Sequence, residues 1–319
     1  MTDPTANPAA ATAAASPFPE WPTVQVAAVN GLQIAYETFG RSSDPTILLV
    51  MGLGTQMIAW PDELCEALAD AGFFVIRYDN RDAGLSTFID APAPSIADLL
   101  LRRNVAYSLD DLATDAFGLL DHLGIERAHV AGTSMGGMIA QTMALRHPER
   151  ILTLCLSMTT TGSKRVGKPT AAVVRQMAAT KPSTSRAAAM EDAVSSWRLL
   201  GTPSALDDVK IRELAGIAWD RNHDPDGRLR QLGAILAQPD RTAGLRQLRI
   251  PTLVVHGLED PLVSVTGGLA LAKAIPGATF IGHHGAGHDL PRSMWRELVR
   301  DLLDHIERSG AAASATASA

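Results

Sequence analysis

The sequence predicts an α/β protein in which a mostly parallel sheet is flanked by helices and carries an inserted helical cap. Short apolar runs alternate with segments of helical periodicity, which is typical of parallel strands buried on both faces. The alternation stops between about Thr160 and Asp240, where apolar residues recur at helical spacing without a strand-like run. With 319 residues, 46% of them hydrophobic, the chain can bury one large core.

The first two strands are predicted from a turn signal. The stretch TVQVAAVNGLQIAYETF contains two strand-like runs joined by Asn30-Gly31, the pair preferred in two-residue hairpin turns. Later strands are predicted from continuous apolar runs at 46–52, 73–79, 127–132, 150–157, 251–257 and 278–283. Helices are predicted between these strands: WPDELCEALADAG ending at Gly72, SLDDLATDAFGLLDHLG from the N-cap Ser108 to Gly124, and a third from about Gly136 to Arg146.

These elements divide the chain into a core of residues 23–159 and 241–308 and a helical cap of residues 160–240. The two ends, residues 1–22 and 309–319, are low-complexity segments rich in alanine, and we expect both to be disordered tails.

Composition excludes several classes of function. There are 28 Lys and Arg against 34 Asp and Glu, a net charge of −6 without a long basic run, which argues against a nucleic-acid partner. The chain has no uninterrupted apolar run of about 18 residues and no secretory signal, so we expect a soluble, cytoplasmic protein without a transmembrane segment. The only cysteines, Cys65 and Cys155, lie in apolar surroundings, and no His/Cys cluster has metal-ligand spacing.

The stretch HVAGTSMGGMIAQ, residues 129–141, places Ser134 between Gly132 and Gly136. Gly-x-Ser-x-Gly is a weak pattern alone, but here it follows a predicted strand and opens a predicted helix, as a nucleophile elbow requires. Such a sharp turn brings strand and helix close together, so larger side chains at the two glycine positions would clash. The helix start also leaves backbone N–H groups facing any developing negative charge.

A serine hydroxyl needs a general base, and the base needs an orienting acid. In a fold of this kind the order along the chain is serine, acid, histidine. Asp260 lies in the loop after the last but one predicted strand, and His288 lies after the last. We therefore predict Ser134 as nucleophile, His288 as general base and Asp260 as acid, with Glu259 as the alternative acid.

The segments GTSMGG, PTLVVHGLEDPLV and GAGHDLP resemble the elbow, acid and histidine segments of the α/β-hydrolase superfamily, over nearly all of the chain between the tails. The segment MGLGTQMIAWPDELCEALADAGFFVIRYDNRDAGLST further resembles the esterase branch that includes aclacinomycin methylesterases and bacterial carboxylesterase- or lipase-like hydrolases. The resemblance implies an oxyanion hole made by the backbone N–H groups of Leu53 and Met135. Where the family usually has His-Gly, this chain has Met51-Gly52, which leaves the backbone donors in place.

These residues predict a serine hydrolase that cleaves carboxylic esters through an acyl-enzyme, with a small, mainly apolar ester as substrate and no cofactor or metal. Trp197 and Trp219 are most simply core residues of the cap, and they are also candidates for lining a substrate pocket. The same triad would serve a methylesterase of a polyketide-type substrate, a lactonase, a thioesterase, a carbon–carbon bond hydrolase or a perhydrolase. From another class, the chain could be a ligand-binding receptor that keeps a hydrolase-like pocket.

Overall fold

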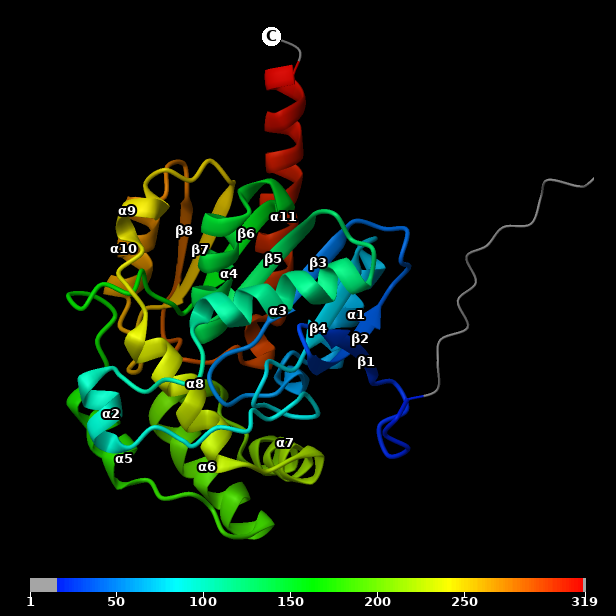
Figure 1. Cartoon of the computed structure of the whole chain (residues 1–319). Helices are drawn as coiled ribbons and strands as arrows, with labels where there is room; N and C mark the ends of the chain where they lie inside the picture. The colour runs from blue at the N-terminus through cyan, green and yellow to red at the C-terminus, as the bar shows by residue number, and fades with distance from the viewer. Residues whose placement is uncertain (1–15, 318–319) are drawn as a thin grey trace, which may run out of the picture.

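The computed structural model describes residues 16–317 and is built around an eight-stranded sheet in the order β1-β2-β4-β3-β5-β6-β7-β8 (Figure 1). Strand β2 pairs antiparallel with β1 and with β4, and the pairs from β4 to β8 are parallel, which confirms the predicted mostly parallel sheet. The strands are β1 Gln25–Val29, β2 Leu32–Phe39, β3 Thr46–Val50, β4 Phe74–Tyr78, β5 Ala128–Thr133, β6 Ile151–Ser157, β7 Thr252–Gly257 and β8 Thr279–His283.

The strands form where the apolar runs and the turn signal predicted them. Asn30 and Gly31 have φ values of 51° and 79°, the left-handed conformation that a two-residue hairpin turn requires at both central positions. Every residue of β3, β4, β5 and β7 is buried, because helices cover both faces of the sheet there.

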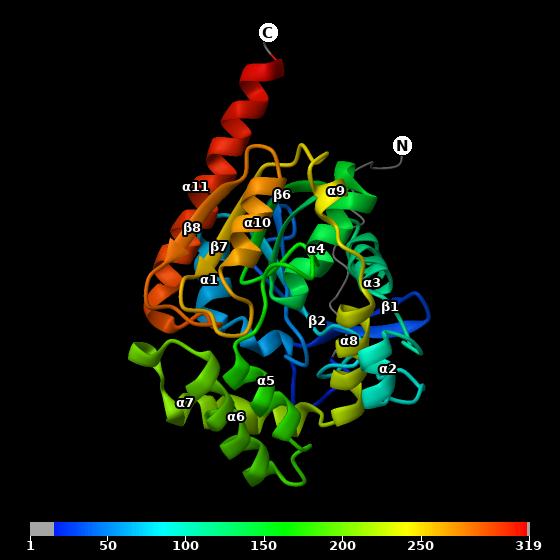
Figure 2. The same ribbon diagram turned by 90° about the vertical axis from the view of Figure 1, so that its left-hand side faces the viewer.

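Two helical layers cover the sheet. On one face, side chains such as Leu48 and Val50 pack with α3, α4, α9 and α10. On the other face, Ile47 and Leu49 pack with α1 and α11, as expected from the two-residue alternation of a strand (Figure 2). The bounds of these helices are α1 Asp62–Asp70, α3 Leu109–His122, α4 Met135–Arg146, α9 Thr242–Leu245, α10 Thr266–Ala274 and α11 Arg292–Ala317.

The segment predicted as the cap holds helices between β6 and β7 that gather beyond one end of the sheet in both views (Figures 1 and 2). They are α5 Ala171–Ala179, α6 Arg186–Leu200, α7 Asp208–Arg221 and α8 Pro225–Ala237. A short helix from the core segment, α2 Ile96–Leu101, packs against α8 and was not predicted. Short 3-10 turns occur at Met57–Ala59, Pro148–Arg150 and Pro203–Ala205.

Some residues of both predicted tails are structured in the described part of the chain. Helix α11 continues to Ala317, so residues 309–317 are helical, because their alanines have a high helix propensity and extend a helix that is already formed. At the other end, Phe18 and Trp21 pack against buried apolar residues of the core, and the Trp21 ring lies 5.4 Å from the Arg221 guanidinium carbon. Residues 1–15 and 318–319 lie outside the described residues.

Among the helices that the structure describes, none is both long enough and apolar enough to span a bilayer.

Candidate active site

Ser134 stands in a strained turn between β5 and α4. Its φ and ψ are 56° and −117°, a conformation that a residue with a side chain adopts only when the surrounding structure enforces it. A Cβ atom on Gly132 would overlap the carbonyl oxygen of Gly136, and one on Gly136 would overlap the carbonyl oxygen of Val50. The steric reason predicted for the two glycines is confirmed.

The turn is also held by hydrogen bonds to the next strand. The Ser134 N–H donates to the carbonyl oxygen of Ser157 at 2.9 Å, and the Thr159 hydroxyl donates to the carbonyl oxygen of Ser134 at 2.7 Å. The serine backbone therefore keeps its unusual conformation while its side chain stays partly accessible to solvent.

The structure brings Ser134, His288 and Asp260 into one hydrogen-bonded chain. Oγ of Ser134 lies 3.1 Å from Nε2 of His288, and Nδ1 of His288 lies 2.7 Å from Oδ2 of Asp260. Because an ionised carboxylate only accepts hydrogen bonds, Nδ1 carries the proton and Nε2 is left to accept one from the serine hydroxyl. His288 and Asp260 are both buried, with 6% and 4% of their surface exposed.

Asp260 is kept ionised by its hydrogen bonds. Burial alone would raise its pKa, but the neighbouring His256 and the hydrogen bond from His288 outweigh that effect and lower the pKa to about 2. Its second oxygen, Oδ1, accepts from the N–H groups of Leu262 and Val263, both at 2.9 Å. The alternative acid, Glu259, instead accepts from the Gly285 N–H at 2.6 Å.

A second histidine lies beside the acid, which sequence reasoning missed. Nε2 of His256 donates to the carbonyl oxygen of Val263 at 2.7 Å and lies 3.5 Å from Oδ2 of Asp260. The available signal was its position near the end of β7, four residues before Asp260, where side chains reach the same edge of the sheet as the acid. The other nearby histidines, His283 and His284, face Glu297 and Glu259 rather than the acid.

The loop after β3 lies against Ser134. A Cβ atom on Gly52 would be 3.3 Å from Cβ of Ser134, so only glycine lets the loop approach this closely without a shift. Within the described chain, the N–H groups of Leu53 and Met135 have no hydrogen-bond acceptor. For Met135 the cause is its place as first residue of α4, where no intrahelical acceptor exists.

Side chains from two other segments brace this loop. The Asn80 side-chain amide donates to the carbonyl oxygen of Met51 at 3.0 Å, and Oε1 of Gln231 accepts from the Gly54 N–H at 2.7 Å. Asn80, after β4, and Gln231, in cap helix α8, thus hold the loop after β3, in which the family's usual histidine is replaced by Met51.

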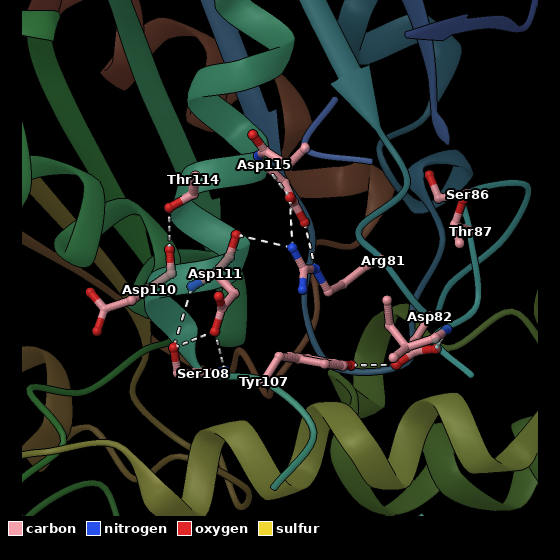
Figure 3. Close-up of polar contacts among 12 residues, drawn as sticks. Arg81, Asp82, Ser86, Thr87, Tyr107, Ser108, Asp110, Asp111, Thr114 and Asp115 are labelled. Atoms are coloured by element: carbon pink, nitrogen blue, oxygen red, sulfur yellow. Dashed lines mark hydrogen bonds and ion pairs between the residues drawn. The ribbon is translucent and has the colours of Figure 1, made fainter. Parts of the chain in front are cut away.

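Two buried ion pairs join the cap to the loop after β4. The Arg230 guanidinium binds both carboxylate oxygens of Asp82 at 2.9 and 2.8 Å. The Tyr107 hydroxyl donates to the same carboxylate at 2.6 Å (Figure 3). In α7, the helix before α8, Arg221 pairs with Asp79 at 2.6 Å, and both side chains are almost fully buried. These contacts fix α7 and α8 over the ends of the core strands.

Two further sets of contacts lie close to this junction between cap and core. Arg81 binds both oxygens of Asp115 in α3 at 2.6 and 2.7 Å (Figure 3). At the end of α6, the carbonyl oxygen of Leu200 accepts from the His288 N–H at 2.7 Å, and Asp289 accepts from the Thr202 N–H at 3.0 Å. The cap therefore contacts the backbone of His288, the predicted general base.

The two cap tryptophans are not joined to the triad by any hydrogen bond in the described structure. Trp219 stacks on His223 with ring centroids 3.6 Å apart, which assigns its ring to packing within the cap. Trp197 lies in α6 and is half-buried, one turn before Leu200. Their role as substrate contacts stays a prediction. In residues 16–317, no group of three His, Cys, Asp or Glu is arranged to hold a metal ion.

With this geometry in place, the comparison with known proteins is decisive for the family. A sequence model of the alpha/beta hydrolase fold matches residues 45–291. The chain belongs to the α/β-hydrolase fold family. The resemblance on which the sequence interpretation depended is thereby confirmed, and so is the fold.

This α/β hydrolase is 31% identical to rhodomycin D methylesterase of Streptomyces sp. (strain C5), over 84% of this chain and 93% of that protein. It is 28% identical to 3-oxoadipate enol-lactonase 2 of Acinetobacter baylyi, over 82% of this chain and 87% of that protein. The crystal structure of the enol-lactonase from Burkholderia xenovorans LB400 superposes with a TM-score of 0.71 at 26% identity, covering 89% of this chain and 100% of that one. These relatives support a hydrolase of the esterase type.

Proposed function

We propose that this α/β hydrolase cleaves carboxylic esters through a covalent acyl-enzyme on Ser134. The observation that carries the proposal is the hydrogen-bonded chain from Oγ of Ser134 through His288 to Asp260. Nε2 of His288 takes the hydroxyl proton while Oγ attacks the ester carbonyl carbon, and the carbonyl oxygen becomes negatively charged. The unpaired N–H groups of Leu53 and Met135 are the donors for this oxyanion, and one such donor stabilises the transition state by about 3–4 kcal/mol.

The same groups complete acylation and then carry out deacylation. His288, now protonated, gives its proton to the leaving alkoxide oxygen, and the alcohol departs. Water then loses a proton to His288 and attacks the acyl carbon, and His288 returns that proton to Oγ of Ser134 as the carboxylic acid is released. Asp260, ionised because its pKa is about 2, fixes the imidazole tautomer and stabilises its cation.

A second candidate within this chemistry is a methylesterase of a polyketide-type substrate, which the similarity to rhodomycin D methylesterase favours. A lactonase is the corresponding candidate from the enol-lactonases. Activity against simple acyl esters, a bulky methyl ester and lactones separates these possibilities. Turnover confined to the bulky methyl ester would assign the methylesterase.

The test is the Ser134→Ala variant assayed with p-nitrophenyl butyrate and with a fluorophosphonate probe. We expect the variant to keep its circular dichroism spectrum and to lose both turnover and labelling. Ser195→Ala, which removes an exposed cap hydroxyl, is the matched control and should keep both. Turnover retained by Ser134→Ala would refute the nucleophile, and a wild-type protein that resists labelling would favour the receptor alternative.

A further inference from the structure

Arg228 on cap helix α8 covers the loop that carries the proposed oxyanion donor. A Cβ atom placed on Gly54 would lie 2.8 Å from Cγ and 2.9 Å from Cδ of Arg228, so the arginine stem rests directly on this glycine. Gly54 follows Leu53 in the chain, and neighbouring Cα atoms are about 3.8 Å apart. Arg228 also precedes Gln231 by one helical turn, and Gln231 binds the Gly54 N–H. Both side chains therefore lie on the helix face that meets the loop.

Arg228 has no acidic partner, unlike the buried arginines of α7 and α8. Arg221 pairs with Asp79, and Arg230 pairs with Asp82 and Asp224. Among the described residues, no carboxylate lies within ion-pair distance of Arg228, and its guanidinium makes no hydrogen bond to another side chain. Within residues 16–317, the charge on Arg228 is thus left without a counter-ion.

The surroundings of Arg228 combine two properties. The side chain is accessible to solvent, yet desolvation by the surrounding protein lowers its pKa from the ordinary value. A guanidinium that is reached by solvent but has lost part of its hydration gains more from an anion than a fully hydrated one does.

We propose that Arg228 is a subsite for a carboxylate carried by the substrate, so that preferred substrates are esters or lactones with a carboxylate close to the scissile carbonyl. This inference rests on the proposed ester hydrolysis at Ser134. The planar guanidinium matches a carboxylate through two parallel hydrogen bonds, which fixes orientation as well as charge. Such a contact positions the ester carbonyl beside Leu53 before Ser134 attacks it.

The experiment compares matched pairs of methyl esters. Monomethyl esters of malonic, succinic, glutaric and adipic acids carry a carboxylate, and methyl esters of monocarboxylic acids with the same carbon number do not. Acid release in a pH-stat gives kcat/KM for each ester. For the wild type we expect the ratio of anionic to neutral kcat/KM to exceed one at the chain length that spans from Ser134 to Arg228.

Three variants test whether Arg228 causes the preference for the anionic ester. Arg228→Met is expected to lower the ratio about tenfold or more, mainly through KM for the anionic ester. Arg228→Lys keeps the charge without the paired donors and is expected to give an intermediate ratio. Arg175→Met removes an equal charge from an exposed position on α5 of the same cap and is expected to leave the ratio unchanged.

The proposal is overturned if the wild type prefers the neutral ester at every chain length, or if Arg228→Met lowers both classes equally. A wild type that hydrolyses none of these esters would contradict the proposed function instead. Binding then decides the subsite separately, by calorimetric titration of Ser134→Ala with monomethyl glutarate. Binding that disappears in Ser134→Ala/Arg228→Met supports the subsite, and binding that persists or never occurs refutes it.

Discussion

Nε2 of His256 lies 3.5 Å from Oδ2 of Asp260, so the carboxylate oxygen that binds His288 has a second imidazole beside it. A hydrogen bond from Nε2 to the carbonyl oxygen of Val263 fixes this ring, and Val263 in turn donates its N–H to Asp260. We therefore expect His256 to be a positioning residue that acts through Asp260.

His256→Phe is expected to lower kcat about tenfold with little change in KM, because the variant loses one donor beside Asp260 while a ring still fills the space. His256→Gln places an amide N–H near the former Nε2 and is expected to recover most of kcat. Steady-state kinetics on a neutral ester measures both values. An effect confined to KM, or equal losses in both variants, would speak against a positioning role.

Asp260 also links stability to pH. Its pKa in the fold is about 2 against an ordinary value of 3.8, so ionised Asp260 stabilises the folded state by about 2 kcal/mol above pH 3.8. That contribution is lost as pH falls from 3.8 toward 2. We expect the free energy of urea unfolding to fall less steeply with acid in Asp260→Asn than in the wild type. The same variant should lose about 10⁴-fold in kcat. Parallel pH profiles would show that the pKa is not lowered by folding.

The elbow glycines give a direct steric prediction. Gly136→Ala places a methyl group on the carbonyl oxygen of Val50, so we expect it to lower the free energy of unfolding by about 2 kcal/mol or more and to abolish turnover. Gly310→Ala is the control, because Gly310 lies in α11 with no atom within 4 Å of the added methyl. The control should raise the free energy of unfolding by about 0.5–1 kcal/mol. Equal stability of the two variants would remove the steric argument.

The ion pair between Arg230 and Asp82 joins the cap to the core, and its coupling energy can be measured with a double-mutant cycle. Arg230→Met leaves a buried carboxylate without its cation, and we expect a loss of about 3 kcal/mol or more in the free energy of unfolding. The double variant Asp82→Asn/Arg230→Met should lose less than the two single variants together, since it removes both charges. Urea unfolding of all four proteins gives the coupling energy. Additive losses would mean that the pair is not coupled.

The sequence predicted those parts of the structure that depend on local patterns. The Asn30-Gly31 turn and the apolar runs sufficed for the strands, since each depends on residues close together in the chain. Ser134, Asp260 and His288 could be placed because each follows a strand, and the ends of parallel strands meet at one edge of the sheet. The geometry that joins them matches that expectation.

Features that depend on distant contacts could not be predicted. Arg230 finds Asp82 across 148 positions of sequence, and nothing near either residue indicates the other. None of the six residues of helix α2 is buried, and Ile96 is 79% exposed. The helix therefore has no buried apolar face, which is the feature that produces a helical pattern in a sequence. His256 lies within strand β7, and its proximity to Asp260 depends on how the loop after that strand folds back.

Cap helices α6, α7 and α8 each contact a core segment that also belongs to the candidate active site. The end of α6 touches His288 and Asp289, α7 holds Asp79, and α8 binds both Asp82 and Gly54. Cap and site are therefore not separable modules. A chimera that exchanges the cap between relatives must exchange these core segments with it, so new specificity in this scaffold has to arise from coordinated changes on both sides of the junction.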